Sequence, residues 1–414
     1  MSDDGRQTRA AAVRAMTAVT DSGATLGDAL PRETKDLPAA EAARAGRLAT
    51  EALRWANRSD RVLGPHLRLK PEDPVMNALR LAIYELFEEG AAPHGVVDAA
   101  VGNVTRSKSG LVNGVLRNVL RREIAWGDLP VPQTPKWLRK RLLSAWGKSA
   151  VEAMERVQAM RTPLDLTCRS APEAWAGKLD ATVLPGGSLR LPPGAQVSAL
   201  PGYAEGAWWV QDAGAAIAAR ALNAKSGERV LDLCAAPGGK TMQLAAAGAQ
   251  VTALDVSKAR MTRVAENLTR TGLQAELVVA DALTWQPDHP FDAVLLDAPC
   301  SATGTLRRHP DLGYARDGTG IADLVALQTK LLDNAAGFVR PGGRLVYCTC
   351  SLLPEEGEEQ IDAFLKRAPA FSLLEIHPDD SAWSVPQGLR IRPDHWEERG
   401  GIDGFFIACL ENRS

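Results

Sequence analysis

One short segment in the second half of the chain limits the possible folds more than any other. Residues 230–233 are mostly apolar, residues 234–239 carry little side-chain bulk, and a stretch compatible with a helix starts near Lys240. This order predicts a strand, a tight turn and the N-terminus of a helix. Glycines in such a turn let backbone N–H groups approach a ligand closely, and the helix dipole favours a carboxylate or phosphate there. The segment therefore predicts an α/β domain with a ligand-binding loop.

Three classes of ligand are bound by loops of this kind. Gly239, Lys240 and Thr241 match the end of a Walker A loop, but that motif requires glycine at the position of Cys234. A dinucleotide-binding domain would show Gly-x-Gly-x-x-Gly, which the loop lacks. S-adenosylmethionine is the third class. Lys240 itself has two interpretations. It either acts in the site, by contacting a phosphate or lowering the pKa of a cysteine, or it is a surface lysine at the start of a helix.

Aspartates end the next three predicted strands. Asp255, Asp281 and Asp297 each follow a short, mostly apolar run. Ligands in open α/β sheets bind outside the carboxyl ends of the strands, so we expect the three carboxylates to converge on one crevice. Any single one of them would equally suit a helix N-cap. Three aspartates in corresponding positions favour S-adenosylmethionine as the ligand. Asp255 would then bind both ribose hydroxyls.

Two cysteines downstream of the loop lie in related settings. Cys300 stands in an Asp-Ala-Pro-Cys-Ser segment and Cys350 in a Thr-Cys-Ser segment. Two thiols facing one cofactor pocket suggest covalent pyrimidine chemistry, because C5 of cytosine accepts a methyl group only after a thiolate has added to C6. A second thiol can then help to release the enzyme. The pattern by itself does not rank the two thiols.

Four segments of the second half resemble the RNA cytosine-C5 methyltransferases of the Sun (Fmu) family. They are 233–241, 297–304, 347–351 and 403–406, and 307–311 also fits. The resemblance extends from about Trp208 to the end of the chain. It departs from the family pattern at Gly357, where asparagine is usual, and at 166–169, where Leu-Thr-Cys-Arg replaces Leu-Arg-Val-Asn.

The resemblance implies a role for each residue of the expected site. Cys350 is the expected nucleophile, and Cys300 is expected to assist breakdown of the adduct. Asp297 is expected to contact the methionine ammonium or, as a protonated acid, N3 of the target base. Asp255 would bind the ribose and Asp281 the adenine edge. The remaining expected cofactor-binding residues are Arg260 at the rim and the loop residues Cys234, Ala235, Ala236, Pro237, Gly238, Gly239 and Lys240.

Residues 6–122 show a helical pattern throughout, with apolar residues three and four positions apart. Three segments, 79–86, 93–97 and 112–117, resemble the antitermination factor NusB, an RNA-binding helical fold. A helical dimerisation or packing module is the alternative. The Pro- and Gly-containing stretch 127–135 predicts a stiff linker.

Basic residues concentrate in one part of the chain. Residues 101–150 contain ten basic side chains and two acidic ones, although the whole chain has a net charge of −2. A phosphate backbone would select this pattern, and a solvated basic face is the alternative. The ten residues are Arg106, Lys108, Arg117, Arg121, Arg122, Lys136, Arg139, Lys140, Arg141 and Lys148. The Arg-Arg-His cluster at 307–309 is a further expected contact to RNA phosphates.

Cysteine usage and hydropathy exclude other classes of protein. Six cysteines are spread over separate segments without the paired spacing of a secreted disulfide framework. Cys348 and Cys350 lack a second pair at metal-ligand spacing, so no metal is expected. No apolar stretch reaches the length of a membrane span, and the first residues do not resemble a signal peptide. The sequence therefore predicts a cytoplasmic protein without a membrane partner.

These features predict a multidomain protein with three parts. An all-α NusB-like RNA-binding domain would cover 1–126, a linker and small α/β subdomain 127–206, and a Rossmann-like S-adenosylmethionine-dependent methyltransferase domain 207–414. We expect a monomer that binds RNA, 16S rRNA in particular, rather than DNA, and methylates C5 of a cytosine. The alternatives are tRNA or 23S rRNA as substrate, a DNA methyltransferase with Cys300 as nucleophile, and a noncatalytic RNA-binding assembly factor.

Overall fold

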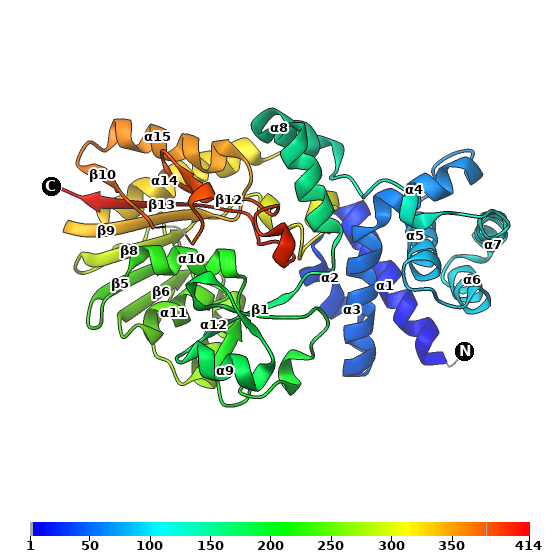
Figure 1. Ribbon diagram of the computed structural model, residues 1–414, viewed down its shortest axis with the longest axis horizontal. Coiled ribbons are helices and arrows are strands. Elements are labelled where there is room, and N and C mark those ends of the chain that lie inside the picture. The colour runs from blue at the N-terminus through cyan, green and yellow to red at the C-terminus, as the bar shows by residue number, and fades with distance from the viewer. Residues whose placement is uncertain (1–2, 378) are drawn as a thin grey trace. The chain divides into compact units, whose positions relative to one another are not determined.

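A computed structural model of the protein describes residues 3–377 and 379–414 (Figure 1). The chain divides into two compact units. The first unit contains Met1–Met160 and Leu306–Gly318, and the second contains Arg161–Thr305 and Thr319–Ser414. This division differs from the boundaries expected at 126 and 206. The helix after the linker packs in the first unit, and a segment from the second half of the chain returns to it.

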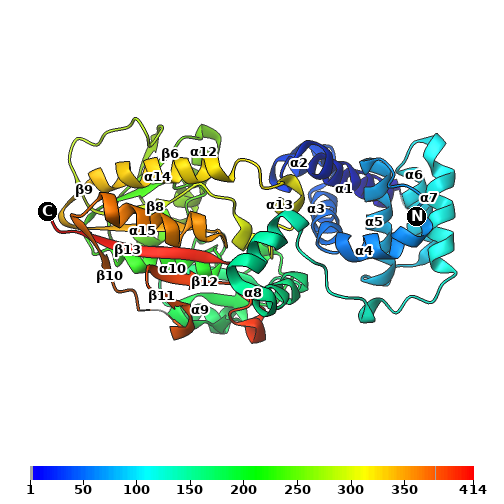
Figure 2. The ribbon, with the colours of Figure 1, turned by 90° about the horizontal axis from the view of Figure 1, so that it is seen from above.

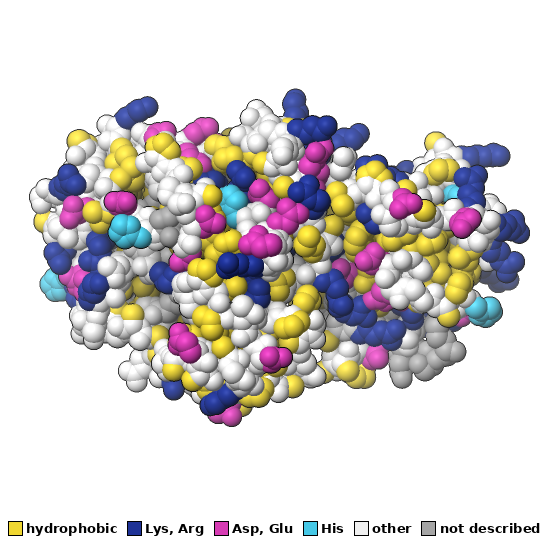
Figure 3. Space-filling model, viewed as in Figure 1, with side chains coloured by type: hydrophobic (Ala, Val, Ile, Leu, Met, Phe, Trp, Pro, Cys, Tyr) yellow, Lys and Arg dark blue, Asp and Glu magenta, His cyan; other side chains and the backbone are white. Residues whose placement is uncertain are grey.

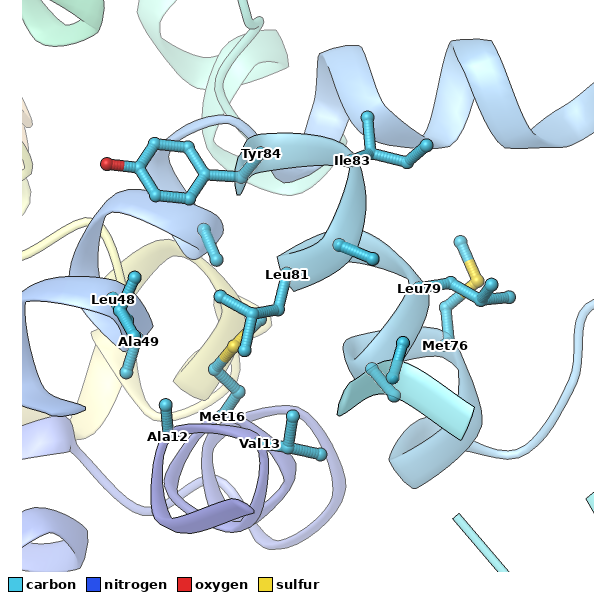
Figure 4. Packing of buried hydrophobic residues seen from close by; sticks show 14 of the residues in the cluster. Ala12, Val13, Met16, Leu48, Ala49, Met76, Leu79, Leu81, Ile83 and Tyr84 are labelled. Atoms are coloured by element: carbon cyan, nitrogen blue, oxygen red, sulfur yellow. The ribbon is translucent and has the colours of Figure 1, made fainter. Parts of the chain in front are cut away.

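The first unit is built from helices whose apolar faces meet in one core. Helix α5 lies at its centre, because every residue from Val75 to Glu85 is buried. Figure 4 shows Met16 of α1 and Leu48 of α3 beside Leu81 of α5. The helices are α1 (Asp3–Ser22), α2 (Leu26–Glu33), α3 (Ala39–Arg54), α4 (Ala56–Leu63), α5 (Asp73–Phe87), α6 (Pro93–Gly102), α7 (Arg106–Leu120), α8 (Lys136–Ala159) and α13 (Leu312–Ala315). The expected all-α N-terminal fold is confirmed.

A buried ion pair joins α1 to α5. The burial of α5 on all sides also buries the carboxylate of Glu85. Arg9 of α1 donates to it from Nε, at 2.9 and 2.8 Å from the two oxygens, and from Nη2 at 2.6 Å. A buried charge is tolerated only when it is paired and hydrogen-bonded. The pair therefore fixes the relative position of these two helices.

The segment Leu306–Gly318 packs inside the first unit, although the residues on both sides of it belong to the second. Tyr314 lies against the helical core. Asp311 Oδ2 accepts a hydrogen bond from the backbone N–H of Leu26 at 2.8 Å, which satisfies one of the free N–H groups at the start of α2. Both apolar contact and hydrogen bonding thus hold this segment on the helices.

The same segment corrects one expectation from the sequence. The side chain of Arg307 is 0% exposed, and its backbone carbonyl accepts a hydrogen bond from Nη1 of Arg54 at 2.8 Å. An arginine enclosed in this way does not face a phosphate backbone, so the expected contact to RNA is wrong for Arg307. The sequence of 307–309 looks like a charged surface cluster. Burial of Arg307 by a distant part of the chain leaves no signal in the neighbouring residues that could have predicted it.

The second unit contains a large sheet in the strand order β11-β12-β13-β9-β8-β5-β6-β7, with β10 paired to β13. The strands β9, β8, β5, β6 and β7 are parallel, and β10 to β13 pair antiparallel. The strands are β5 (Arg229–Leu233), β6 (Gln250–Asp255), β7 (Glu276–Val279), β8 (Phe291–Asp297), β9 (Val339–Thr349), β10 (Phe371–Leu374), β11 (Ser384–Val385), β12 (Gly388–Ile391) and β13 (Phe405–Asn412). The expected α/β methyltransferase-like fold is confirmed.

Helices cover both faces of this sheet (Figures 1 and 2). In β8, Ala293 and Leu295 pack on the side of α10, whereas Val294 and Leu296 pack on the side of α14, because successive residues of a strand point to opposite faces. The helices are α10 (Ala213–Leu222), α11 (Gly239–Ala246), α12 (Lys258–Thr271), α14 (Ile321–Gly337) and α15 (Glu358–Arg367). With both faces covered, a ligand reaches the sheet at the edge where its strands end.

A small antiparallel sheet precedes the large one in the chain, in the order β2-β3-β1-β4. Its strands are β1 (Leu164–Cys168), β2 (Thr182–Val183), β3 (Leu189–Leu191) and β4 (Trp208–Val210), with α9 (Pro172–Leu179) between the first two. Asp165 and Arg190 form a buried pair at 2.7 Å. Arg190 also donates to the carbonyl of Gly401 at 2.8 Å, which connects the small sheet to the rest of the second unit.

We predict that Asp311→Ala lowers the free energy of unfolding by about 1–3 kcal/mol, because the buried N–H of Leu26 loses its acceptor. Urea denaturation followed by circular dichroism measures the loss, and hydrogen exchange at Leu26 localises it. Asp311→Asn keeps a carbonyl oxygen and serves as the control. An equal loss in both variants would show that the charge of Asp311, not its acceptor oxygen, stabilises the segment.

Candidate active site

The expected ligand-binding loop joins β5 to α11. Cys234 and Gly238 have positive φ values of 60° and 100°. A Cβ atom at Gly238 would lie 3.0 Å from Cγ1 of Val264, so the turn requires glycine at this position. The backbone N–H of Ala235 donates to the carbonyl of Leu254 at 3.0 Å. The loop therefore lies against the end of β6.

Asp255 lies at the carboxyl end of β6, directly beside this loop. Its carboxylate is 2% exposed and accepts backbone N–H groups from Ala236 at 3.2 Å and Ser257 at 2.9 Å. Nη1 of Arg260 is 3.2 Å from the same carboxylate, and its guanidinium also donates to the carbonyl of Ala236. The structure thus brings Arg260, Asp255 and the loop together. Asp281 follows β7 at the same edge, is exposed, and accepts the N–H of Leu283 at 2.9 Å.

Lys240 and Asp297 form a pair at this edge of the sheet. Lys240 is 8% exposed, and its Nζ lies 2.7 Å from Oδ2 of Asp297. Burial is the largest single influence and would lower the pKa of Lys240, but the charge and hydrogen bond of Asp297, together with Cys348 and Asp232, outweigh it, so the pKa is raised and the amine stays protonated. The interpretation of Lys240 as a surface lysine is wrong. Sγ of buried Cys348 donates to the other oxygen of Asp297 at 3.5 Å.

Cys300 and Cys350 lie in the loops that follow β8 and β9. Their Sγ atoms are 3.5 Å apart, and no disulfide joins them. The hydrogen bond with Cys350, burial and the nearby charge of Glu356 raise the pKa of the Cys300 thiol well above its usual range. Cys300 is therefore held as a neutral thiol. The structure brings together the two thiols that the sequence singled out, with Asp297 at the start of the Cys300 loop.

Two buried acids of this region were not singled out from the sequence. Asp232 of β5 accepts the hydroxyl of Thr241 at 2.6 Å, and burial raises its pKa to about 7. Glu356, in the turn after the Cys350 loop, is 0% exposed and accepts hydrogen bonds from Ser301 and Ser351. Each of these serines follows one of the two cysteines. The acidic run at 355–359 looks like a solvated helix start in the sequence, so only the fold reveals this contact.

The departure from the family pattern at Gly357 has a steric explanation. A Cβ atom there would lie 2.5 Å from Nη2 of Arg390 and 2.7 Å from Cγ of Phe406. Arg390 is itself fixed, because it pairs with Glu358 at 2.5 Å. A side chain at position 357 would therefore require these neighbours to move. In this chain the position serves close packing rather than an amide contact.

The basic residues of 101–150 divide between two helical regions of the first unit. Arg117, at the end of α7, is exposed, as are Arg121 and Arg122 just beyond it. Arg139 of α8 instead pairs with the buried carboxylate of Glu155 at 2.9 Å, so it has a structural role. Figure 3 shows Lys and Arg side chains gathered over α7 and over the top of α8. The exposed members remain the expected contacts to phosphates.

Two other kinds of site are absent from residues 3–377 and 379–414. Within these residues, no three His, Cys, Asp or Glu side chains are grouped so that they could hold a metal ion. No helix in the same ranges is both long and apolar enough to span a bilayer.

Comparison with known proteins matches both units. A family model described as 16S rRNA methyltransferase RsmB/F matches residues 219–411, and the NusB family model matches residues 6–121. Ribosomal RNA small subunit methyltransferase B of Klebsiella pneumoniae is 40% identical over 359 residues, which cover 81% of each chain. The protein of that name from Pseudomonas putida is 36% identical over 432 residues, covering 97% of this chain and 98% of the relative.

A solved structure supports the same relationship at the level of the fold. The crystal structure of PH0851 superposes with a TM-score of 0.76 and 25% sequence identity, covering 97% of this chain and 98% of that one. The helical and α/β parts are therefore shared with relatives over nearly the whole length. The chain belongs to the family of ribosomal RNA small subunit methyltransferase B.

Proposed function

We propose that the protein transfers a methyl group from S-adenosylmethionine to C5 of a cytosine in 16S rRNA, through a covalent bond between Cys350 and C6 of the base. The 3.5 Å contact between the sulfur atoms of Cys300 and Cys350 carries this proposal. Methylation at C5 needs a nucleophile and a means of releasing it, whereas methylation of an RNA oxygen or amino group needs neither. The relatives are named for small-subunit rRNA, which favours 16S rRNA over other RNAs.

The residues at the edge of the sheet fit S-adenosylmethionine. The glycine loop leaves backbone groups accessible where a side chain at Gly238 would collide with Val264. Oδ1 of Asp255 accepts one N–H group and so has a second acceptor site for a ribose hydroxyl, and Asp281 lies at the next strand end for the adenine edge. Asp297 offers a carboxylate for the methionine ammonium. When bound, S-adenosylmethionine supplies a methyl group on a positively charged sulfur.

In the proposed reaction Cys350 attacks C6 as a thiolate. The new S–C6 bond moves the C5–C6 π electrons toward C5 and toward N3, where negative charge develops. The ammonium of Lys240, paired with Asp297 at 2.7 Å, would stabilise that charge. In its alternative role Asp297 would donate to N3 as a protonated acid instead of binding the methionine ammonium. C5 would then take the methyl group, while the bond from that methyl to the cofactor sulfur breaks and leaves a neutral thioether. Release of the enzyme needs a base to remove the C5 proton, and the electrons of that C–H bond restore the C5–C6 double bond. Cys350 leaves as a thiolate.

The state of Cys300 supports this division of labour. A thiol is a nucleophile only as a thiolate, and the raised pKa of Cys300 keeps it protonated near neutral pH. Cys300 is therefore less suited to attack, and it could take the C5 proton during release of Cys350 only after losing its own proton. The target base must also leave its stack, because C6 is not accessible to a thiol inside a helix.

Asp255→Ala is expected to weaken the binding of S-adenosylmethionine by about 1.5–3 kcal/mol, as when a hydrogen bond to a charged group is lost. Asp255→Asn keeps one acceptor oxygen and should lose less. Isothermal titration calorimetry with S-adenosylmethionine and with ATP measures both affinities. An unchanged affinity in the alanine variant would remove Asp255 from the site, and tight binding of ATP instead would overturn the cofactor.

The exposed arginines at the end of α7 are expected to contribute RNA affinity. Replacing Arg117, Arg121 and Arg122 with alanine should reduce the slope of log affinity against log salt by up to about 0.7–0.9 for each phosphate that the protein no longer neutralises. Filter binding to 16S rRNA at several salt concentrations gives the slope. The control is a triple alanine variant at the exposed residues Arg340, Lys366 and Arg367, which removes the same number of positive charges from the second unit. Equal slopes in the parent and the α7 variant would show that the α7 arginines do not contact RNA.

The two thiols should behave differently when each is removed. Cys350→Ala is expected to abolish methylation and the covalent complex with RNA. Cys300→Ala should still attack and methylate but stall before release, leaving a protein–RNA adduct that survives denaturing electrophoresis. An adduct that accumulates in Cys350→Ala and is absent from Cys300→Ala would assign the nucleophile to Cys300.

A further inference from the structure

Glu356 is a buried acid whose hydrogen bonds converge on the two cysteine loops. It ends the turn Pro354–Glu356 and is 0% exposed. Its Oε1 accepts the backbone N–H of Ser301 at 2.9 Å and Nε2 of Gln328 at 3.0 Å. Its Oε2 accepts the hydroxyls of Ser301 and Ser351, the latter at 2.5 Å. A carboxylate has about four lone-pair sites, so these four donors use its full capacity.

The backbone of Glu356 is fixed as firmly as its side chain. Its carbonyl accepts the hydroxyl of Tyr347 at 2.9 Å and the hydroxyl of Thr349 at 3.1 Å. Both donors lie at the end of β9, directly before Cys350. The carboxylate is therefore held at a defined position relative to the strand that carries this thiol.

The Cys300 loop is held from two sides by the same group of residues. Gln328 of α14 donates to the carbonyl of Pro299 at 2.9 Å as well as to Glu356. Both neighbours of Cys300 are therefore held in place. Gln328 binds the carbonyl of Pro299, and Glu356 binds the N–H of Ser301. Oγ1 of Thr303 adds a further connection, because it accepts the N–H of Leu352 from the Cys350 loop at 2.9 Å.

We propose that Glu356 is a positioning residue that holds the Cys300 and Cys350 thiols together for a reaction that needs both. The inference rests on the proposed function, since only a two-thiol reaction requires their spacing to be controlled. Glu356 acts through hydrogen bonds to Ser301 and Ser351, the neighbours of the two cysteines. It is therefore distinct from the residues that contact the substrate.

The requirement for a carboxylate follows from the donors that face it. In Glu356→Gln one acceptor oxygen becomes an NH₂ donor. Depending on the orientation of the amide, this NH₂ group would face either the hydroxyls of Ser301 and Ser351 or the N–H of Ser301 and Nε2 of Gln328. Hydroxyls can rotate and accept, so Glu356→Gln keeps the volume and part of the network while losing acceptor sites. Alanine would leave all four donors without this acceptor in a buried region.

Glu356→Gln tests the proposal, with Glu359→Gln as the control. Glu359 is an exposed acid three positions further along the chain. The first measurement is the rate at which diamide oxidises the two thiols to a Cys300–Cys350 disulfide in protein without RNA. The thiols lose two protons and two electrons, and diamide is reduced to the hydrazine. We expect slower disulfide formation in Glu356→Gln and an unchanged rate in Glu359→Gln, because release of the loops lowers the effective concentration of one thiol near the other.

The second measurement is steady-state methylation of 16S rRNA. Misplacement of a reacting group by about 1 Å can lower a rate about 100-fold, so kcat should fall by about that factor in Glu356→Gln. The KM for RNA and the affinity for S-adenosylmethionine should stay at the parental values, since the hydrogen bonds of the network run between the two cysteine loops, β9 and α14. A purely structural role would instead lower the melting temperature and weaken cofactor binding together with kcat.

The two measurements separate the inference from the proposed function. Disulfide formation in Glu356→Gln that is as fast as in the parent, or a parental kcat, would overturn the positioning role. If the parent protein does not methylate cytosine C5, the proposed function fails while the oxidation rates still decide whether Glu356 holds the thiols. If Glu356→Gln does not fold, the double variant Ser301→Ala and Ser351→Ala removes two hydroxyl donors and is expected to give the same pair of effects.

Discussion

The parallel pairing of β8 and β9 is the constraint on which the site depends. Its register sets Asp297 opposite Cys348, so the loops that leave the two strands begin side by side. Parallel neighbours need a long crossover, which here contains α14, and the two thiols must therefore be distant in sequence. The sheet brings Cys300 and Cys350 to 3.5 Å nevertheless. Asp297 and the glycine loop share that edge because β8 also pairs with β5.

Several polar groups at this edge, among them Lys240, Asp255 and Glu356, are buried, and their partners decide their chemical state. Asp297 keeps Lys240 protonated, whereas Glu356 and Cys350 help to keep Cys300 protonated. A buried network of this kind stabilises a fold only if every member is satisfied, and it then defines one arrangement of its side chains. We infer that the edge is organised to fix proton positions around a substrate. The same hydrogen bonds fix the two cysteine loops.

The path of the chain after Cys300 adds a second constraint. The chain leaves the α/β unit after Thr305, packs on the helical unit as Leu306–Gly318, and re-enters the α/β unit at Thr319. Asp311 and Tyr314 anchor this excursion on the helices. The Cys300 loop thus begins at the end of β8 and is followed, after Thr305, by a segment that folds with the helices. Division into separate domains along the sequence does not describe this connection.

The sequence by itself determined the elements that carry local signals. Apolar runs ending in aspartate predicted β6, β7 and β8, the glycine loop predicted the turn before α11, and apolar residues at helical spacing predicted the N-terminal helices. The two cysteine segments were recognised by their neighbours. Each of these signals lies within a few residues, since strand alternation, turn geometry and helix periodicity are local properties of the backbone.

Only the tertiary structure decided which of the charged residues are buried. Lys240, Arg307 and Glu356 have ordinary sequence surroundings, yet each is enclosed by parts of the chain far away in sequence. Burial depends on long-range packing, and its effect on a charged group depends on which partner arrives with it. The sequence therefore located the two thiols and the three strand-end aspartates, and the packing of the sheet and its loops set their contacts and their protonation.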